Sequence, residues 1–203
     1  MSNICIIPAR GQSQRIPRKN VRAFMGNPII WYSIEKARAC GLFEEVYVTT
    51  DSPEIMKLSM DHGAKWIARP KEMAIDSVGT RDVIRFTANQ LGLKNTDNVC
   101  CIYATAPMMS TEDIATGYMY LSTLQVAHAI SIGYPPLRDA AQFYWSRVEA
   151  LRDNIEYFGP ATALVTVKPE RICDINTMDD WRTAEKMYKK LMEMNRPKMR
   201  IVK

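Results

Sequence analysis

The stretch Ile6-Ile7-Pro8-Ala9-Arg10-Gly11-Gln12-Ser13-Gln14-Arg15-Ile16-Pro17-Arg18-Lys19-Asn20 lies near the start of the chain, where an apolar run gives way to a basic loop. Residues 4–7 predict a buried strand, which ends at two strong breakers of regular structure, Pro8 and Gly11. The loop that follows has no acidic residue and carries four cations, Arg10, Arg15, Arg18 and Lys19. Because these cations repel one another, the loop requires either an anionic partner or full solvation.

The small residues of this loop are compatible with an anionic ligand. Gly11 and Ser13 would let an oligophosphate approach the backbone N–H groups closely. Open α/β sheets bind their ligands at the carboxyl ends of the strands, which is where this loop follows its strand. A basic turn that is simply solvated explains the charge pattern equally well. Both interpretations therefore stay open on the residues alone.

Length and composition predict one domain of 1–194 followed by a basic tail of 195–203. The chain has 203 residues, of which 47% are hydrophobic, so a sizeable core can form. Its net charge of +5 is mild and fits a small anionic substrate, although many enzymes without such a ligand are equally basic. Neither a signal peptide nor an apolar run of about 20 residues is present, so we expect no membrane partner. Five cysteines without CxxC spacing indicate a reducing, cytoplasmic setting.

Strand-like and helix-like segments alternate along the chain, which predicts an α/β fold with a parallel sheet and helices on both faces. The polar segment 72–79 and the Pro-containing segment 133–141 are interpreted as loops. Strands are expected at residues 4–7, 46–50, 64–68, 99–103, 127–132 and 164–167, and helices at 29–40, 53–62, 80–91, 110–124 and 177–194.

Several polar residues follow predicted strands, and each has a structural alternative. Asp51 is interpreted as a turn residue or helix cap rather than a ligand group. The small residues after Tyr103 would admit a ligand, although a tight turn explains them equally well. Asp139 and Gln142 precede aromatic residues expected in the core, and either could contact a ligand. His62 and His128 have no ligand-spaced partners and are interpreted as structural or surface residues.

Asp174 and Asn176 form a candidate metal site. In extended backbone, residues two apart point to the same side, so the two side-chain oxygens could hold Mg²⁺ together with a phosphate. The alternative is that Asn176 and Thr177 merely begin the next helix, in which Thr177 and Asp180 have the spacing of a capping box.

The motif of residues 8–20 resembles the signature of the acylneuraminate cytidylyltransferases, also called CMP-sialic acid synthetases. Further matches run along almost the whole chain: Thr50-Asp51, Arg69-Pro70, Gly79-Thr80, Tyr103-Ala104-Thr105-Ala106-Pro107, Gln142-Phe143-Tyr144-Trp145 and Asp174-Ile175-x-Thr177-x-x-Asp180-Trp181. The Tyr-Ala-Thr-Ala-Pro and Gln-Phe-Tyr-Trp blocks are most similar to the pseudaminic acid branch.

This resemblance implies a Rossmann-like three-layer fold of the nucleotide-diphospho-sugar transferase type, with a mainly parallel sheet. It implies that CTP and a nonulosonic acid are joined, with Mg²⁺, into a CMP-sugar and pyrophosphate. Arg10, Lys19 and Asp174 would be catalytic, and Asp174 and Asn176 would bind the metal. The nucleotide would contact Pro8, Ala9, Arg10, Gly11, Ser13, Arg15, Asn20, Arg69 and Thr80. The sugar would contact Tyr103, Thr105, Asp139 and Gln142.

The chain departs from the family pattern in three places. Gln12 and Gln14 replace a Gly and a Lys of the loop, and Asn176 replaces one carboxylate of an Asp-x-Asp metal pair. The family carries several tens more residues, including a dimer-forming excursion, where this chain has only 133–141. The residue before Asp139 is Arg138 in place of a His. We therefore expect a monomer or weak homodimer with a reduced sugar site.

Three functions are considered. The first is a cytidylyltransferase for pseudaminic or sialic acid. The second is a shortened relative that binds a nucleotide or CMP-sugar with little or no catalysis. The replaced carboxylate of the metal pair and the missing excursion favour this second function. The third, a nucleic-acid surface, ranks last because the cations form one compact loop without an aromatic stacking platform.

Overall fold

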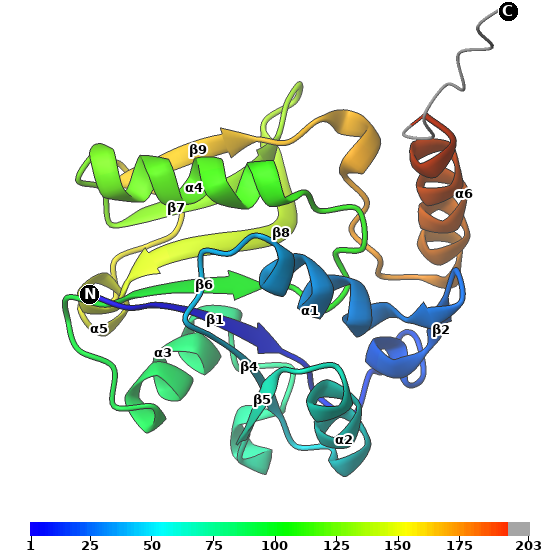
Figure 1. The fold of residues 1–203 in the computed structure, drawn as a ribbon, viewed down its shortest axis with the longest axis horizontal. Helices are drawn as coiled ribbons and strands as arrows, with labels where there is room; N and C mark the ends of the chain where they lie inside the picture. The colour runs from blue at the N-terminus through cyan, green and yellow to red at the C-terminus, as the bar shows by residue number, and fades with distance from the viewer. Residues whose placement is uncertain (195–203) are drawn as a thin grey trace, which may run out of the picture.

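The computed structural model describes residues 1–194, and the predicted tail of 195–203 lies outside the described residues. Its centre is a seven-stranded sheet of order β5-β4-β1-β6-β8-β7-β9 (Figure 1). The strands are β1 (Asn3–Pro8), β4 (Glu45–Thr50), β5 (Lys65–Ala68), β6 (Asn98–Ile102), β7 (His128–Gly133), β8 (Arg138–Arg147) and β9 (Thr162–Thr166). A separate small hairpin joins β2 (Ala23–Phe24) to β3 (Asn27–Pro28).

Most strand pairs of the sheet are parallel, as predicted. β1 pairs in parallel with both β4 and β6, and β7 pairs in parallel with β9. β8 is the exception, because it lies antiparallel between β6 and β7. The mainly parallel α/β architecture is therefore confirmed, with one antiparallel strand inside the sheet.

Helices cover both faces of the sheet, which gives the predicted three layers (Figure 1). Alternate residues of β1 point to opposite faces, since Cys5 and Ile7 belong to one core cluster and Ile4 and Ile6 to another. The first cluster takes residues from α1 (Ile29–Ala39), α2 (Pro53–Asp61) and α4 (Thr111–Thr123). The second takes residues from α3 (Thr80–Gln90) and the short α5 (Val148–Arg152).

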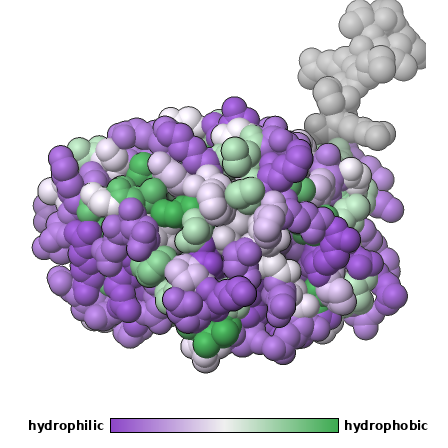
Figure 2. Space-filling model, turned by 90° about the horizontal axis from the view of Figure 1, so that it is seen from below, coloured by the Kyte–Doolittle hydropathy of each residue, from purple (hydrophilic) through white to green (hydrophobic). Residues whose placement is uncertain are grey.

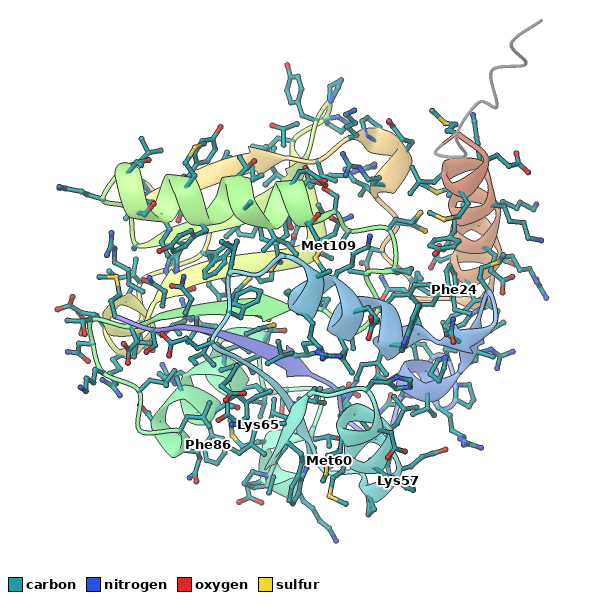
Figure 3. All side chains as sticks on the ribbon, in the orientation of Figure 1. Phe24, Lys57, Met60, Lys65, Phe86 and Met109 are labelled. Carbon is teal, nitrogen blue, oxygen red and sulfur yellow. The ribbon has the colours of Figure 1, made fainter. Side chains whose placement is uncertain are left out.

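The last described helix, α6 (Met178–Met194), lies beside β2 at one end of the sheet (Figure 1). Phe24 of β2, labelled in Figure 3, is fully buried there, with its ring centroid 5.6 Å from those of Tyr32, Trp181 and Tyr188. Edge-to-face aromatic contacts of this kind stabilise beyond the area that they bury. This third cluster holds the end of the described chain against the segment that follows the basic loop. Three short 3-10 helices complete the fold: η1 (Lys19–Val21), η2 (Lys71–Met73) and η3 (Pro169–Arg171).

The prediction of a loop at residues 133–141 is wrong in its second half. β8 begins at Arg138, so residues 134–137 form the turn of a β7–β8 hairpin. The hairpin contains a bulge, in which the Ser131 hydroxyl oxygen accepts hydrogen bonds from the N–H groups of Gln142 and Phe143. A bulge interrupts the two-residue alternation of a strand, which is why the sequence pattern did not predict the start of β8. The following aromatic residues are buried, as predicted.

The face of the molecule drawn in Figure 2 is mostly hydrophilic, with a few small and separate hydrophobic patches. Within residues 1–194, none of the helices combines the length and apolar character that crossing a membrane requires.

Candidate functional site

A cavity of about 670 Å³ opens beyond the carboxyl ends of β1 and β6. Pro8, the last residue of β1, lines it, and so do Tyr103 and Thr105, which follow β6. The strand order reverses at this point, because the chain passes from β1 to β4 on one side and from β6 to β7 on the other, and open α/β sheets bind ligands at such a switch point. The remaining lining residues come from the basic loop, from the segments before and at the start of α3, from β8 and from the segment before α6.

Most residues predicted for the site meet at this cavity. Ala9, Gly11 and Gln142 are outside its lining. The predicted residues that line it are Pro8, Arg10, Ser13, Arg15, Lys19, Asn20, Arg69, Thr80, Tyr103, Thr105, Asp139, Asp174 and Asn176.

The cations of the basic loop divide between the cavity and solvent. Arg10, Arg15 and Lys19 line the cavity, whereas Arg18 is exposed and forms an ion pair with Glu54 of α2. Arg69 adds a further guanidinium to the lining, although its side chain comes from the segment after β5. The cavity thus gathers positive charge from two distant segments, which a solvated turn would not require.

Ala9 and Gly11 fix the position of the basic loop through hydrogen bonds of their backbone N–H groups. The Ala9 N–H donates to the Thr49 carbonyl at 3.0 Å, and the Gly11 N–H donates to an Asp51 carboxylate oxygen at 2.7 Å. A side-chain carbon on Gly11 would lie 2.9 Å from the Cβ of Ser52, so the loop could not pack as closely against the start of α2. Asp51 is thus a turn residue that holds the loop, in agreement with its predicted structural role.

Lys19 connects the basic loop to the segment before α6. Its ammonium group donates a hydrogen bond to the carbonyl oxygen of Ile175. Burial lowers the pKa of Lys19, an effect that the nearby Asp174 carboxylate opposes and that Arg15 and Arg10 reinforce. Lys19 and Asp174 therefore place charges of opposite sign in the same cavity lining.

Residues 174–177 form the predicted start of a helix, and they also contribute to the cavity lining. Asp174 and Asn176 line the cavity, and the amide nitrogen of Asn176 donates to a carboxylate oxygen of Asp174 at 2.6 Å. Thr177 and Asp180 exchange the contacts of a helix start, because the Thr177 N–H donates to Asp180 at 2.7 Å and the Asp180 N–H donates to the Thr177 hydroxyl at 3.2 Å. The same turn therefore starts α6 and presents an acidic group to the cavity.

Another part of the cavity lining carries hydroxyl groups and a second carboxylate. The Tyr103 and Thr80 hydroxyls lie 3.2 Å apart, and burial raises the pKa of Tyr103 to about 12. Asp139 accepts hydrogen bonds from the Tyr144 hydroxyl and, at 2.8 Å, from the Ala141 N–H. These contacts hold the carboxylate of Asp139 in one position at the cavity wall.

Gln142 points elsewhere. It is buried, and its amide nitrogen donates to the Arg171 carbonyl at 2.6 Å. The bulge beside Ser131 alters the alternation of β8, so the sequence could not show which face each residue of this strand occupies.

Ile75, Asp76 and Val78 also line the cavity, although their segment was predicted only as a polar loop. Asp76 forms an ion pair with Arg10, 66 positions earlier in the numbering. Local sequence carries no signal for such a contact, because it depends on the order of the strands in the sheet.

A family model described as cytidylyltransferase matches residues 4–193 of this chain. The chain belongs to the cytidylyltransferase family. This confirms the resemblance seen in the residues, and curated relatives show which branch it is similar to. The pseudaminic acid cytidylyltransferase of Campylobacter jejuni subsp. jejuni serotype O:2 is 32% identical, over 93% of this chain and 97% of that protein. The N-acylneuraminate cytidylyltransferase A of Danio rerio is 27% identical, over 98% of this chain and 53% of that protein.

Solved structures of low sequence identity share the fold of this cytidylyltransferase. A CMP:2-keto-3-deoxy-manno-octonic acid synthetase complexed with CTP matches 94% of this chain and all of that one, with a TM-score of 0.73 and 16% identity. A cytidylyltransferase from Leptospira borgpetersenii matches 96% of this chain and 95% of that one, with a TM-score of 0.72 and 13% identity. The alignment with the Campylobacter protein spans 225 positions, more than the 203 residues of this chain. The chain therefore leaves some aligned positions empty.

Proposed function

We propose that this cytidylyltransferase joins CTP to a nonulosonic acid of the pseudaminic or sialic acid type, giving a CMP-sugar and pyrophosphate. The observation that carries the proposal is the meeting of Arg10, Lys19 and Asp174 at one cavity beyond the carboxyl ends of β1 and β6. These residues come from the two ends of the chain, and the family match spans both. The similarity to pseudaminic acid cytidylyltransferases supports that sugar first.

In the proposed reaction, the anomeric hydroxyl of the sugar acid attacks the α-phosphorus of CTP, and pyrophosphate leaves in line. Such a displacement needs positioning and charge neutralisation more than covalent help from the protein. Arg10 and Lys19 would bind the phosphate oxygens on which negative charge accumulates. Asp139, which also lines the cavity, would accept hydrogen bonds from sugar hydroxyls, because the Tyr144 hydroxyl already orients its carboxylate.

We propose Mg²⁺ as the cofactor, held by Asp174 and the amide oxygen of Asn176. Mg²⁺ is commonly coordinated by one or two carboxylates and completes its coordination sphere with water and substrate phosphates. The carboxylate of Asp174 and the amide oxygen of Asn176 are ligands of this kind. Among residues 1–194, His, Cys, Asp and Glu form no cluster of three or more that would make a protein-only metal site. The ion, when bound, would neutralise phosphate charge. Asp174 would hold the ion and Lys19 would bind the phosphates, both within the same cavity lining.

The short β7–β8 hairpin supports a monomer or weak homodimer. Its turn, residues 134–137, has no room for the excursion that forms dimer contacts in the resembled family. Free thiols at all five cysteines agree with the reducing, cytoplasmic setting that we propose. Light scattering across a dilution series tests the oligomeric state, and a dimer that persists at nanomolar concentration would contradict the proposal.

Pyrophosphate release from CTP, measured against a panel of nonulosonic acids, tests the proposed function. Release that requires both CTP and one sugar acid is the expected result. Thermal-shift measurements with CTP, ATP, GTP and a DNA oligonucleotide run in parallel. Stabilisation by CTP without pyrophosphate release would identify the shortened, non-catalytic relative instead. Stabilisation by DNA alone would indicate a nucleic-acid surface.

A further inference from the structure

The Arg10 guanidinium, which we expect to meet the phosphates of the substrate, already has a partner. It forms an ion pair with the carboxylate of Asp76, and both side chains line the cavity. The two side chains are only partly shielded, with 30% and 50% of their surfaces exposed. An ion pair as accessible as this is weak, because water and salt screen it.

Asp76 lies in a segment, residues 74–79, that is held mainly at its two ends. On one side, Nε of the buried Arg69 donates to the Met73 carbonyl at 2.7 Å. On the other side, the segment runs directly into α3, which begins at Thr80. Among the described residues, the ion pair with Arg10 is the side-chain polar contact that connects this segment to the basic loop.

The segment also exposes an apolar side chain at the cavity. Ile75 lines the cavity although 52% of its surface is exposed. Segment 74–79 therefore forms part of the cavity wall, and the Arg10–Asp76 ion pair connects it to the basic loop. Any ligand that displaces Asp76 from Arg10 would also break this connection between the segment and the basic loop.

A phosphate group and a carboxylate use the same donors of a guanidinium, since both accept its paired N–H groups. They therefore compete for Arg10, and a polyphosphate carries more negative charge than the single carboxylate of Asp76. An uncharged ligand offers no such exchange. The pair thus weakens the binding of any ligand whose phosphates must take Arg10, and it leaves the binding of an uncharged ligand unchanged.

We propose that Asp76 is a resident counter-ion that the phosphate chain of the nucleotide displaces from Arg10, and that it thereby lowers the affinity of the cavity for polyphosphates. Displacement releases segment 74–79 from the basic loop. In taking CTP as the natural ligand, the proposal rests on the proposed function. The exchange itself concerns any polyphosphate that enters the cavity.

Isothermal calorimetry with CTP, inorganic tripolyphosphate and cytidine tests this exchange on the wild type and on Asp76→Asn. Because an exposed pair of this kind is weak, we expect Asp76→Asn to bind CTP and tripolyphosphate about two- to fivefold more tightly. Cytidine affinity should not change, since cytidine has no phosphate. Asp61→Asn is the matched control, because Asp61 forms an exposed ion pair with Lys57 on α2, and it should leave all three affinities unchanged.

A double-mutant cycle separates competition for Arg10 from simple removal of a negative charge. In an Arg10→Gln background, Asp76→Asn should no longer tighten tripolyphosphate binding. An equal gain in that background would overturn the proposal, as would unchanged or weaker binding by Asp76→Asn alone. A wild type that binds tripolyphosphate but not CTP would contradict the proposed function and leave the exchange supported. Normal CTP turnover, together with unchanged CTP and tripolyphosphate affinities in Asp76→Asn, would support the proposed function and contradict the exchange.

Discussion

Lys19 donates a hydrogen bond from its ammonium group to the backbone carbonyl of Ile175, which lies 156 residues further along the chain. Packing holds the two segments in place, because Ile16 and Ile175 are fully buried in the same core cluster. The basic loop and the segment before α6 therefore meet at a fixed position. One wall of the cavity is consequently built from both ends of the described chain.

Lys19→Ala should reduce turnover by roughly 10²-fold, the scale expected when one charge contact to the transition state is lost. Arg10→Ala should cause a loss of similar size. Lys57→Ala is the control, since Lys57 is exposed on α2 and pairs with Asp61 outside the cavity. Initial rates of pyrophosphate release measure the effect, and circular dichroism verifies folding. Near-normal rates in both folded variants would show that these cations do not serve the reaction.

Asn176→Asp should lower the Mg²⁺ concentration needed for half-maximal rate. The substitution replaces the 2.6 Å hydrogen bond from Asn176 to Asp174 with two adjacent carboxylates, which attract a divalent cation more strongly. Mg²⁺ titration of the rate and of the melting temperature measures the change. Asn89→Asp, on α3 outside the cavity lining, is the control for added charge. A requirement for Mg²⁺ that is unchanged or higher would contradict the placement of the metal.

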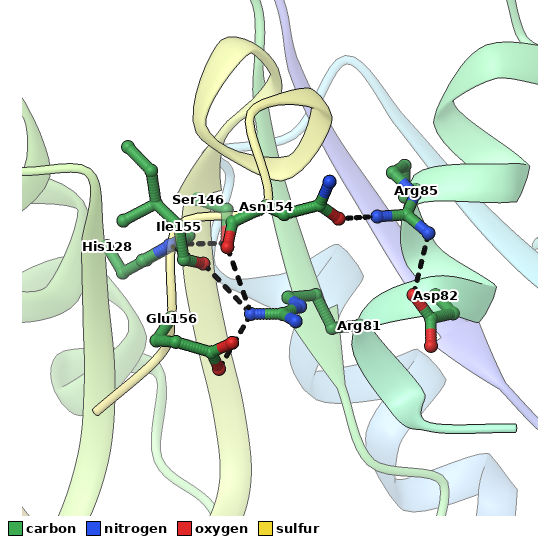
Figure 4. Close-up of polar contacts among 8 residues, drawn as sticks. All are labelled: Arg81, Asp82, Arg85, His128, Ser146, Asn154, Ile155 and Glu156. Atoms are coloured by element: carbon green, nitrogen blue, oxygen red, sulfur yellow. Dashed lines mark hydrogen bonds and ion pairs between the residues drawn. The ribbon is translucent and has the colours of Figure 1, made fainter. Parts of the chain in front are cut away.

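Stability should decrease as the pH falls from about 6.5 to 4 because of His128. The His128 ring is fully buried, with Nδ1 2.9 Å from the Ser146 hydroxyl and Nε2 3.1 Å from the Ile155 carbonyl oxygen (Figure 4). Burial lowers the pKa of His128 to about 4, partly opposed by its hydrogen bond to the Ile155 carbonyl. Arg81, which also donates to that carbonyl, lowers it further.

Between these two pH values, His128 is mostly protonated in the unfolded chain, where its pKa is near 6.5, and mostly neutral in the folded protein. The free energy of unfolding should therefore fall by about 2–3 kcal/mol between pH 6.5 and 4 through this residue. Denaturant unfolding at several pH values measures the slope. His128→Gln should flatten it, and His62→Gln, outside this buried network, should not. An equal slope in His128→Gln would refute the prediction.

Gly117→Ala should destabilise the fold by about 1–3 kcal/mol through overpacking. A methyl group at Gly117 of α4 would lie 2.7 Å from the Trp145 ring and 2.8 Å from the Phe143 ring, both fully buried in β8. Neither ring has space to move, because protein cores are closely packed. Ser122→Ala, at an exposed position of the same helix, is the control. Thermal unfolding of the two variants measures the difference, and equal stability would mean that the core can adjust at this contact.

Local sequence determined the elements of this protein. The apolar run before Pro8 forms β1, and Ser110 caps α4, at the start of the helix predicted at 110–124, by accepting from the Asp113 N–H at 3.1 Å. Such features depend on residues within a few positions of one another, so their physical cause is contained in the local sequence. The basic loop and its position after the first strand were identified for the same reason.

Tertiary structure alone decided which distant residues meet. The antiparallel insertion of β8, the pairing of Arg10 with Asp76 and the bond from Lys19 to Ile175 all join segments that local periodicity cannot relate. A bulge beside Ser131 also changed which side of β8 its residues occupy, and Gln142 points away from the cavity as a result. Strand order and register are set by the packing of the whole core, because only burial of all the apolar faces together selects one arrangement.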